Sequence, residues 1–355
     1  YLTLVDAVRE GKVSVAEIDE SVRRILRAKY ALGLFERPYV DESRETKEML
    51  TAENLDAARR VAQKSIVLLK NSNGVLPLSK GVKTLAVIGP LADSREDMLG
   101  SWFAHGKAEE AVGLLEAIRA RVGFQTEVLY EQGTGVLEGS DQEVADAVAA
   151  ARRADVVVLA LGEHGKMSGE ARSRVSLELP GRQQELLEKV TAAGKPVVLV
   201  AMSGRPLTIT WAAEHVPAIL WPWYPGSQGG HAIADVLFGD VNPGGKLPVT
   251  FPRSVGQVPI YYNHEPNGRP CNPDVKWNSR YRDIKSCDPQ YVFGYGLSYT
   301  GFTYSDLALD RETMREGESI TVSVRVNFSA NSDSIFSRCS RYFSRSIWSA
   351  DGLAF

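Results

Sequence analysis

Cysteine is scarce in this chain of 355 residues, which contains three, so neither a disulfide framework nor an all-cysteine zinc site is expected. Positive charge is not in excess either, since 41 Lys and Arg stand against 44 Asp and Glu. That balance argues against a general nucleic-acid binder.

The longest apolar runs, 155–162 and 196–204, have strand length and fall short of the roughly 18 apolar residues of a membrane span. The five histidines form no H-x-x-x-H pair, so no metal site is indicated. The remaining composition, 44% hydrophobic and 24% charged, is typical of a globular protein of roughly two domains.

The middle of the chain alternates apolar runs of strand length with helix-like segments. Strands are expected at 84–89, 126–130, 155–162, 196–202 and 217–221, and helices at 109–122, 142–154, 180–193, 207–214 and 228–238. Strands that are hydrophobic throughout and alternate with helices predict a parallel sheet covered on both faces. The expected fold class is therefore α/β, with a mostly parallel sheet sandwiched by helices. Ligands of such sheets gather at the carboxyl ends of the strands.

Both ends of the chain differ from this middle. Residues 14–32 predict an amphipathic helix that begins with a capping box formed by Ser14 and Glu17. A single apolar stripe needs a partner, so we expect this helix to be the last element of a domain that lies mostly upstream. Alternating residues up to Val326 predict a half-buried strand. From Ser329 onward no period remains, as expected of either a mis-joined end or a natural disordered tail.

Residues 240–300 lack the regular pattern and are rich in Pro, Gly, Asn and aromatic residues, which indicates a long surface loop with short strands. Cys271 and Cys287 lie in this segment. In an oxidising compartment they could form a disulfide across the loop. Two free thiols are an equally good interpretation.

The loop after the second long apolar strand holds the densest set of chemically active residues. Residues 161–174 read LGEHGKMSGEARSR, so Glu163 and Glu170 lie among a histidine and several cations. Loops at strand ends carry function more often than strands do, and a glutamate whose pKa is raised by the site could act as a general acid. The alternative is a solvated loop whose charges pair with one another, and residue types alone favour it.

Other apparent motifs are weaker. The Gly-Thr-Gly at 133–135 lacks the third glycine of a dinucleotide fingerprint. The glycines at 226–230 could hold an anion at a helix N-terminus, but tight packing explains them equally well. Ser203 lacks the G-x-S-x-G elbow of serine hydrolases. The aromatic cluster at 221–224 could stack on a sugar, although core packing is the commoner explanation.

Seven segments, spread over nearly all of residues 14–327, match one known family in sequence and in order. They are RILRAKYALGLFERPY (24–39), AARRVAQKSIVLLKNSNGVLPL (57–78), LAVIGPLAD (85–93), SGEARSR (168–174), SGRPL (203–207), GGHAIADVLFGDVNPGGKLPVTFPRSVGQVP (229–259) and FGYGLSYTGF (293–302). Together they resemble bacterial glycoside hydrolase family 3, the β-glucosidase group, and its periplasmic members in particular. Each segment alone is weak, whereas the whole series is highly specific.

The resemblance implies an assignment of the parts of the chain. Members of the family have an N-terminal (β/α)8-like barrel, then an α/β sandwich, and often a fibronectin-III-like β-sandwich. The expected parts are the last helix of a missing barrel (1–36), a linker (37–80), the α/β sandwich domain (81–260), a connecting loop (261–289), a truncated fibronectin-III-like domain (290–328) and an aberrant tail (329–355).

The resemblance also implies a retaining mechanism, in which an Asp of the barrel is the nucleophile and a Glu of the second domain is the acid/base. By motif the acid/base is Glu170, with Glu163 as the runner-up. The expected substrate contacts are Met167, Ser168 and Arg174. The nucleophile motif is absent from this sequence, so we expect the chain alone to be inactive.

The implied function is exo-acting hydrolysis of terminal β-D-glucosyl residues from β-glucosides or oligosaccharides, with this chain supplying the acid/base domain. The resemblance implies no cofactor, no metal, no nucleic-acid partner and no membrane partner. It also implies a periplasmic or secreted location and is compatible with a homodimer. The alternative function is a non-catalytic α/β domain that binds sugar or protein. A flavodoxin-like nucleotide binder is disfavoured because the phosphate loop is missing.

Overall fold

The computed structural model describes residues 2–330 except 266–267, 269–270, 272–273, 276–278, 285 and 316. The chain divides into two compact units, one ending at Asn54 and the other starting at Leu55, and each is described by itself. The tail expected from residue 329 lies outside the described residues, apart from Ser329 and Ala330, whose backbone ends a strand.

The first unit contains helices joined by loops. Its helices are α1 (Leu2–Arg9), α2 (Val15–Ala31) and the short α3 (Arg44–Glu48), and α4 (Ala52–Ser65) crosses into the second unit. The capping box predicted for α2 is confirmed, because the Glu17 N–H donates to Ser14 Oγ (3.2 Å) and the Ser14 N–H donates to the Glu17 carboxylate (2.8 Å). No side chain of α2 is buried, and Ile25 is 60% exposed. The predicted apolar stripe therefore lies at the surface of this unit.

The second unit is built around a six-stranded sheet in the order β1-β6-β5-β4-β2-β3. The strands are β1 (Val67–Asn71), β2 (Thr84–Ile88), β3 (Glu127–Glu131), β4 (Val156–Gly162), β5 (Val197–Met202) and β6 (Ala218–Trp221). Neighbouring strands run parallel except β1, which pairs antiparallel with β6. Strands β4 and β5 are buried along their whole length, as their continuous apolar sequences predict. The predicted α/β fold with a mostly parallel sheet is confirmed.

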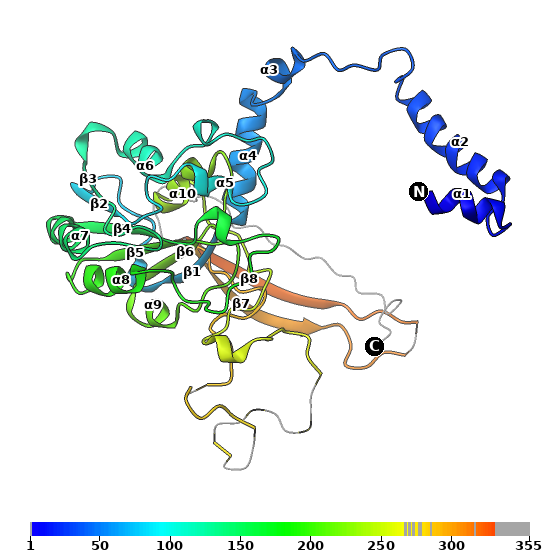
Figure 1. Cartoon of the computed structure of the whole chain (residues 1–355). Helices are drawn as coiled ribbons and strands as arrows, with labels where there is room; N and C mark the ends of the chain where they lie inside the picture. Colours follow the sequence, from blue (N-terminus) through cyan, green and yellow to red (C-terminus); the bar gives the residue numbers. More distant parts are fainter. Residues whose placement is uncertain are drawn as a thin grey trace. The chain divides into compact units, whose positions relative to one another are not determined.

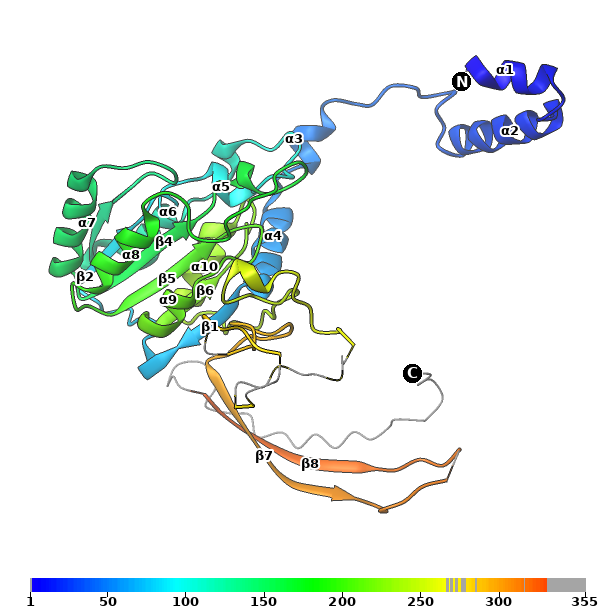
Figure 2. The same cartoon turned by 60° about the horizontal axis from the view of Figure 1, so that its bottom comes forward.

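Helices cover both faces of this sheet, as Figure 1 and Figure 2 show. One face packs against α4, α5 (Glu96–Leu99), α6 (Leu114–Val122) and α10 (Gly229–Leu237), and the other against α7 (Asp141–Arg153), α8 (Gln183–Thr191) and α9 (Thr210–His215). Alternate strand residues serve the two cores, so that Val158 belongs to the first and Leu159 to the second. No helix in the described part of the chain is long and apolar enough to cross a membrane.

Several elements differ from the expectation: α1, α3 and α4 were not predicted, and α9 begins at Thr210 rather than at residue 207. Strand β1 has no counterpart among the predicted strands and falls within the expected linker. Helix α6 begins at Leu114 rather than near residue 109, because Gly113 is an extended N-cap (ψ 159°). Helix α8 begins at Gln183 rather than Pro180, because Gly181 has φ +60°, which lies outside the right-handed helical region.

The carboxyl ends of four parallel strands bring their following segments to one edge of the sheet. Strands β2, β4, β5 and β6 are parallel, and each is followed by a loop at that edge. Gly162 ends β4 with φ +141°, and a Cβ there would collide with the Met202 carbonyl oxygen of β5. Glycine thus allows the chain to leave β4 close to its neighbour and form the loop singled out from the sequence.

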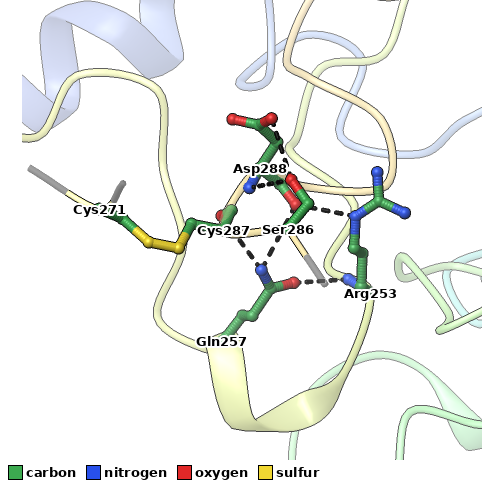
Figure 3. The surroundings of a disulfide bond; sticks show 6 residues. All are labelled: Arg253, Gln257, Cys271, Ser286, Cys287 and Asp288. Carbon is green, nitrogen blue, oxygen red and sulfur yellow. Dashed lines mark hydrogen bonds between the residues drawn. A yellow bond between two sulfur atoms is a disulfide. The ribbon is translucent and has the colours of Figure 1, made fainter. Parts of the chain in front are cut away.

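The connecting loop after the sheet is closed by a disulfide between Cys271 and Cys287, whose Cα atoms are 6.1 Å apart (Figure 3). The Gln257 amide donates to the Cys287 carbonyl oxygen (3.2 Å), and Gln257 Oε1 accepts from the Arg253 N–H (2.7 Å). Of the two interpretations left open by the sequence, the structure contains the disulfide. Hydrogen bonds through Gln257 connect the disulfide-bonded Cys287 to Arg253, in the segment that follows α10.

A separate two-stranded antiparallel sheet follows, formed by β7 (Thr300–Leu309) and β8 (Val322–Ala330). Figure 2 shows it as a long ribbon. It occupies the part of the sequence expected to start a β-sandwich. The strand predicted to reach Val326 is confirmed, and it continues to Ala330. Its predicted half-burial is wrong, because Val322, Val324 and Val326 are 48%, 37% and 37% exposed.

Candidate active site

Glu163 is the first residue after β4, and its side chain is completely buried (0% exposed). Its N–H donates to the Met202 carbonyl oxygen (2.9 Å), which extends the pairing of β4 with β5 by one residue. The backbone therefore directs a carboxylate into the interior at the carboxyl edge of the sheet. A charged group buried there needs opposite charges or strong hydrogen-bond donors around it.

Both oxygens of the Glu163 carboxylate accept hydrogen bonds. Oε1 accepts from Arg174 Nη1 (2.5 Å). Oε2 accepts from Ser203 Oγ (2.6 Å), Ser168 Oγ (3.2 Å) and Arg205 Nε (3.2 Å). Each oxygen thus has at least one donor from the protein, and the side chain is completely buried. Glu163 therefore has no free oxygen to present to another molecule, and its contacts hold the surrounding chain together.

The contacts around Glu163 fix both ends of the loop 163–174. The ion pair between Glu163 and Arg174 joins the first and last residues of this loop directly. Arg205, which follows β5, donates from Nη2 to the carbonyl oxygens of Met167 and Arg172, the latter at 2.7 Å. The tip of the loop between these two carbonyls is thus held from both sides.

Glu170 lies at this tip and is exposed. Its neighbours Gly169 (φ +114°) and Ala171 (φ +56°) both have positive φ, a conformation that costs an alanine about 1 kcal/mol. A Cβ on Gly169 would lie 3.1 Å from Ser101 Oγ and 3.5 Å from Trp102 Nε1. Within the described ranges, no hydrogen bond or ion pair holds the Glu170 carboxylate. The loop therefore presents an exposed carboxylate, and its neighbour Gly169 lies close to Trp102, which is 74% exposed.

A second buried carboxylate, Asp97 of α5, holds the start of the loop. Its Oδ1 accepts from the Gly165 N–H (2.7 Å), and its Oδ2 accepts from Ser94 Oγ (2.6 Å). His164 Nδ1 lies 3.1 Å from each carboxylate oxygen. Asp97 is 6% exposed, so these hydrogen bonds are made largely out of contact with water and are correspondingly strong.

Tyr224, in the segment after β6, holds the loop from a third direction. Its hydroxyl donates to the His164 carbonyl oxygen (2.9 Å). Burial raises the pKa of Tyr224 to about 12, so the hydroxyl keeps its proton at neutral pH and remains a donor. The segments after β2, β5 and β6 all contribute side chains that anchor the loop after β4.

The charge pairing expected by one interpretation of the loop is present in its inner part, although Glu163 and Ser168 are buried rather than solvated. Its inner residues Glu163, Ser168 and Arg174 are bonded to one another, as in a charge-paired loop. Glu170 is exposed at the tip, and Met167 is half-buried beside it.

Of the residues near the loop, Trp221 and Ser203 were considered in the sequence, whereas no pattern marked a role for Asp97 or Arg205. Trp221 of the aromatic cluster is completely buried, with its ring centroid 4.8 Å from that of Phe251, so core packing explains it. Ser203 serves as a donor to Glu163. Asp97 follows no recognisable motif, and Arg205 appears only within the matching segment SGRPL. In the described part of the chain, no group of three or more His, Cys, Asp or Glu side chains is placed to hold a metal ion.

Comparison with protein families and curated proteins identifies relatives of the chain. Residues 66–299 match the family model described as the glycosyl hydrolase family 3 C-terminal domain. A periplasmic beta-glucosidase of Salmonella typhimurium is 44% identical over 90% of this chain and 45% of its own length. A beta-xylosidase of Formosa agariphila is 39% identical over 91% of this chain and 44% of its own length. The chain thus spans somewhat less than half the length of these relatives.

Solved structures give the same result. The beta-glucosidase from Listeria innocua in complex with isofagomine is 39% identical, with a TM-score of 0.81 over 92% of this chain and 45% of that chain. The same enzyme in complex with glucose is 40% identical, with a TM-score of 0.80 over 91% of this chain and 44% of that chain.

Proposed function

Because this chain belongs to glycosyl hydrolase family 3, we propose that it supplies the acid/base domain of a retaining β-glucosidase that removes terminal β-D-glucosyl residues. The chain covers 45% of the similar periplasmic beta-glucosidase, so the activity is proposed for a longer protein that contains this chain. Similarity to beta-xylosidases makes terminal β-xylosyl residues the second candidate substrate. The comparisons give no support to a non-catalytic binding domain.

The observation that carries this proposal is the position of Glu170. It is an exposed carboxylate at the tip of a loop whose base is fixed by the buried carboxylates of Glu163 and Asp97. A general acid from one domain must reach a glycosidic oxygen bound in another, so it needs an exposed side chain on a well-anchored segment. Glu163, the runner-up, has both oxygens engaged in the interior.

In the proposed mechanism Glu170 acts in both steps of a double displacement. It first protonates the departing glycosidic oxygen while a carboxylate of the barrel attacks the anomeric carbon, and it then activates water to release glucose. Met167, Ser168 and Arg174 remain proposed substrate contacts. Of these, Met167 is partly exposed, whereas Ser168 and Arg174 would act from their positions around Glu163.

The parts of the longer protein follow from the same proposal. Residues 1–36 would end a barrel, and residues 37–80 would link it to the sandwich domain, although β1 within this range already pairs with β6. The α/β sandwich would extend to residue 260, and a connecting loop would lead to a fibronectin-III-like domain beginning near residue 290. We propose a periplasmic or secreted location, which the similarity to a periplasmic enzyme and the disulfide support. The proposed substrates are β-glucosides or oligosaccharides, and a homodimer is a further proposal.

The chain on its own is expected to show no glycosidase activity. A retaining glycosidase needs two carboxyl groups about 5–5.5 Å apart, and the proposed nucleophile belongs to a domain outside this sequence. The measurement is release of nitrophenol from a nitrophenyl β-glucoside by the purified chain, with the Glu170→Ala chain as control. Turnover well above that control would show that a nucleophile is present within the chain.

The longer protein provides the positive test of the proposal. It should hydrolyse nitrophenyl β-glucoside with a higher kcat/KM than nitrophenyl β-xyloside. The reverse order would replace β-glucosyl with β-xylosyl as the substrate, and absence of activity toward both would contradict the proposed function.

A further inference from the structure

We propose that Arg205 is a positioning residue that fixes the loop carrying Glu170, an inference that rests on the proposed role of Glu170 as the acid/base. Arg205 lies in the segment after β5, and its side chain reaches across to the loop after β4. It acts through the backbone of that loop and makes no contact with the Glu170 carboxylate.

A single guanidinium group holds both sides of the loop tip. Nη2 of Arg205 donates to the carbonyl oxygens of Met167 and Arg172, while Nε donates to Glu163 (3.2 Å). The stretch between the two carbonyls, 168–171, includes Glu170. Positive φ is free of strain at Gly169 but unfavourable at Ala171 (φ +56°), so the backbone at Ala171 depends on anchors on either side.

The support that holds Arg205 is itself well fixed. The Arg205 N–H donates to Ser203 Oγ (3.1 Å), directly after the buried strand β5. A Cβ on Gly204 would lie 2.8 Å from Ser168 Cβ, so only glycine lets the two loops approach this closely. Pro206 follows and restricts the backbone on the other side. A rigid strand end therefore carries the side chain that holds the neighbouring loop.

Arg205 does two things: it bridges two carbonyl oxygens of the loop, and it places a positive charge beside Glu163. A substitution by lysine can separate these two effects. A planar guanidinium carries several donors in a fixed arrangement, whereas a lysine ammonium is a compact point charge. Arg174 also pairs with Glu163 but contacts neither the Met167 nor the Arg172 carbonyl. An Arg205→Lys variant should keep a positive charge beside Glu163 and lose the bridge across the loop tip.

The first test is hydrogen exchange in this chain. Arg205→Lys should raise the exchange rates of backbone amides in 165–173 by about tenfold or more, while its thermal midpoint stays close to that of the wild type. The matched control is Arg182→Lys. Arg182 also bonds carboxylates and the Gly139 carbonyl, but it touches no residue of the loop. Unchanged exchange in 165–173 in Arg205→Lys would overturn the inference whatever Glu170 does.

The second test measures kcat/KM in the longer protein. A displaced general acid should lower kcat/KM by about 100-fold for β-linked disaccharides and much less for dinitrophenyl β-glucoside, which needs little proton transfer. The fall should lie in kcat rather than KM. An equal fall for every substrate would mean that Arg205 is merely structural and would overturn the inference. If Glu170→Ala itself shows no leaving-group dependence, the proposed acid/base role of Glu170 is overturned instead. The positioning of the loop by Arg205 would still stand in that case if Arg205→Lys makes the loop amides exchange faster.

Discussion

Replacement of Glu170 with alanine in the longer protein is expected to slow hydrolysis of β-linked disaccharides by roughly 100- to 10,000-fold. A sugar alkoxide is a poor leaving group and needs a proton as the glycosidic bond breaks. Dinitrophenolate leaves without such help, so the first step with dinitrophenyl β-glucoside should be nearly unchanged. The measurement is kcat/KM over a series of aryl and alkyl β-glucosides, whose dependence on leaving-group pKa should become steeper in the variant.

The same variant should respond to azide. Glu170 is also the proposed base of the second step, so its loss should leave the glycosyl-enzyme waiting for water. Azide attacks without needing a base, and it should therefore raise turnover of activated substrates by Glu170→Ala and leave the wild type unaffected. The expected product is β-glucosyl azide, because two inversions retain the configuration.

Glu163→Gln is the matched control for both measurements, since it alters the other glutamate of the same loop. Its carboxylate is bonded on both oxygens in the interior, so any leaving-group dependence should come only from a shifted loop and should be much smaller than in Glu170→Ala. Azide should not rescue the variant, because Glu170 is still present as the base of the second step. Leaving-group dependence and azide rescue in Glu163→Gln, with neither in Glu170→Ala, would reverse the two assignments.

The sheet was predictable because its central strands are buried on both faces. Strands β4 and β5 read as uninterrupted apolar runs for that reason. Strand β1 is different, because only its first three residues are buried and its place depends on antiparallel pairing with β6, far along the chain. The starts of α6 and α8 depend on the backbone angles of Gly113 and Gly181, and residue type does not determine those angles.

The sequence predicted which loop holds the candidate site but not which of its side chains are buried and which are exposed. Residue types and spacing mark Glu163 and Glu170 equally, since both lie in one glycine-broken segment. The difference between them is burial: Ser203 and Arg205 after β5 bond the Glu163 carboxylate in the interior, whereas Glu170 is exposed. Such contacts between distant segments leave no periodic signal in the sequence. The family resemblance selects Glu170 by motif, and its catalytic role stays a prediction.

Replacement of Glu163 with alanine in this chain is expected to lower the free energy of unfolding by about 3 kcal/mol. The change removes a completely buried carboxylate and leaves the guanidinium groups of Arg174 and Arg205 without the counter-charge that they share. The effect should lie at the lower end for a broken buried ion pair, because the two side chains are 17% and 18% exposed and regain some hydration. The thermal midpoint should fall by roughly 5 °C.

Glu185→Ala is the matched control, because Glu185 also bonds two cations, Arg182 (2.8 Å) and Lys189 (2.7 Å). Its side chain is 36% exposed, so solvent screens both pairs and the midpoint should change far less. A double variant separates the role of the charge cluster from simple loss of packing. The destabilisation caused by Arg205→Met should shrink in a Glu163→Ala background, since the positive charge then has no buried partner to lose. Equal midpoints for Glu163→Ala and Glu185→Ala, with additive effects in the double variant, would mean that Glu163 does not hold the loop that carries Glu170.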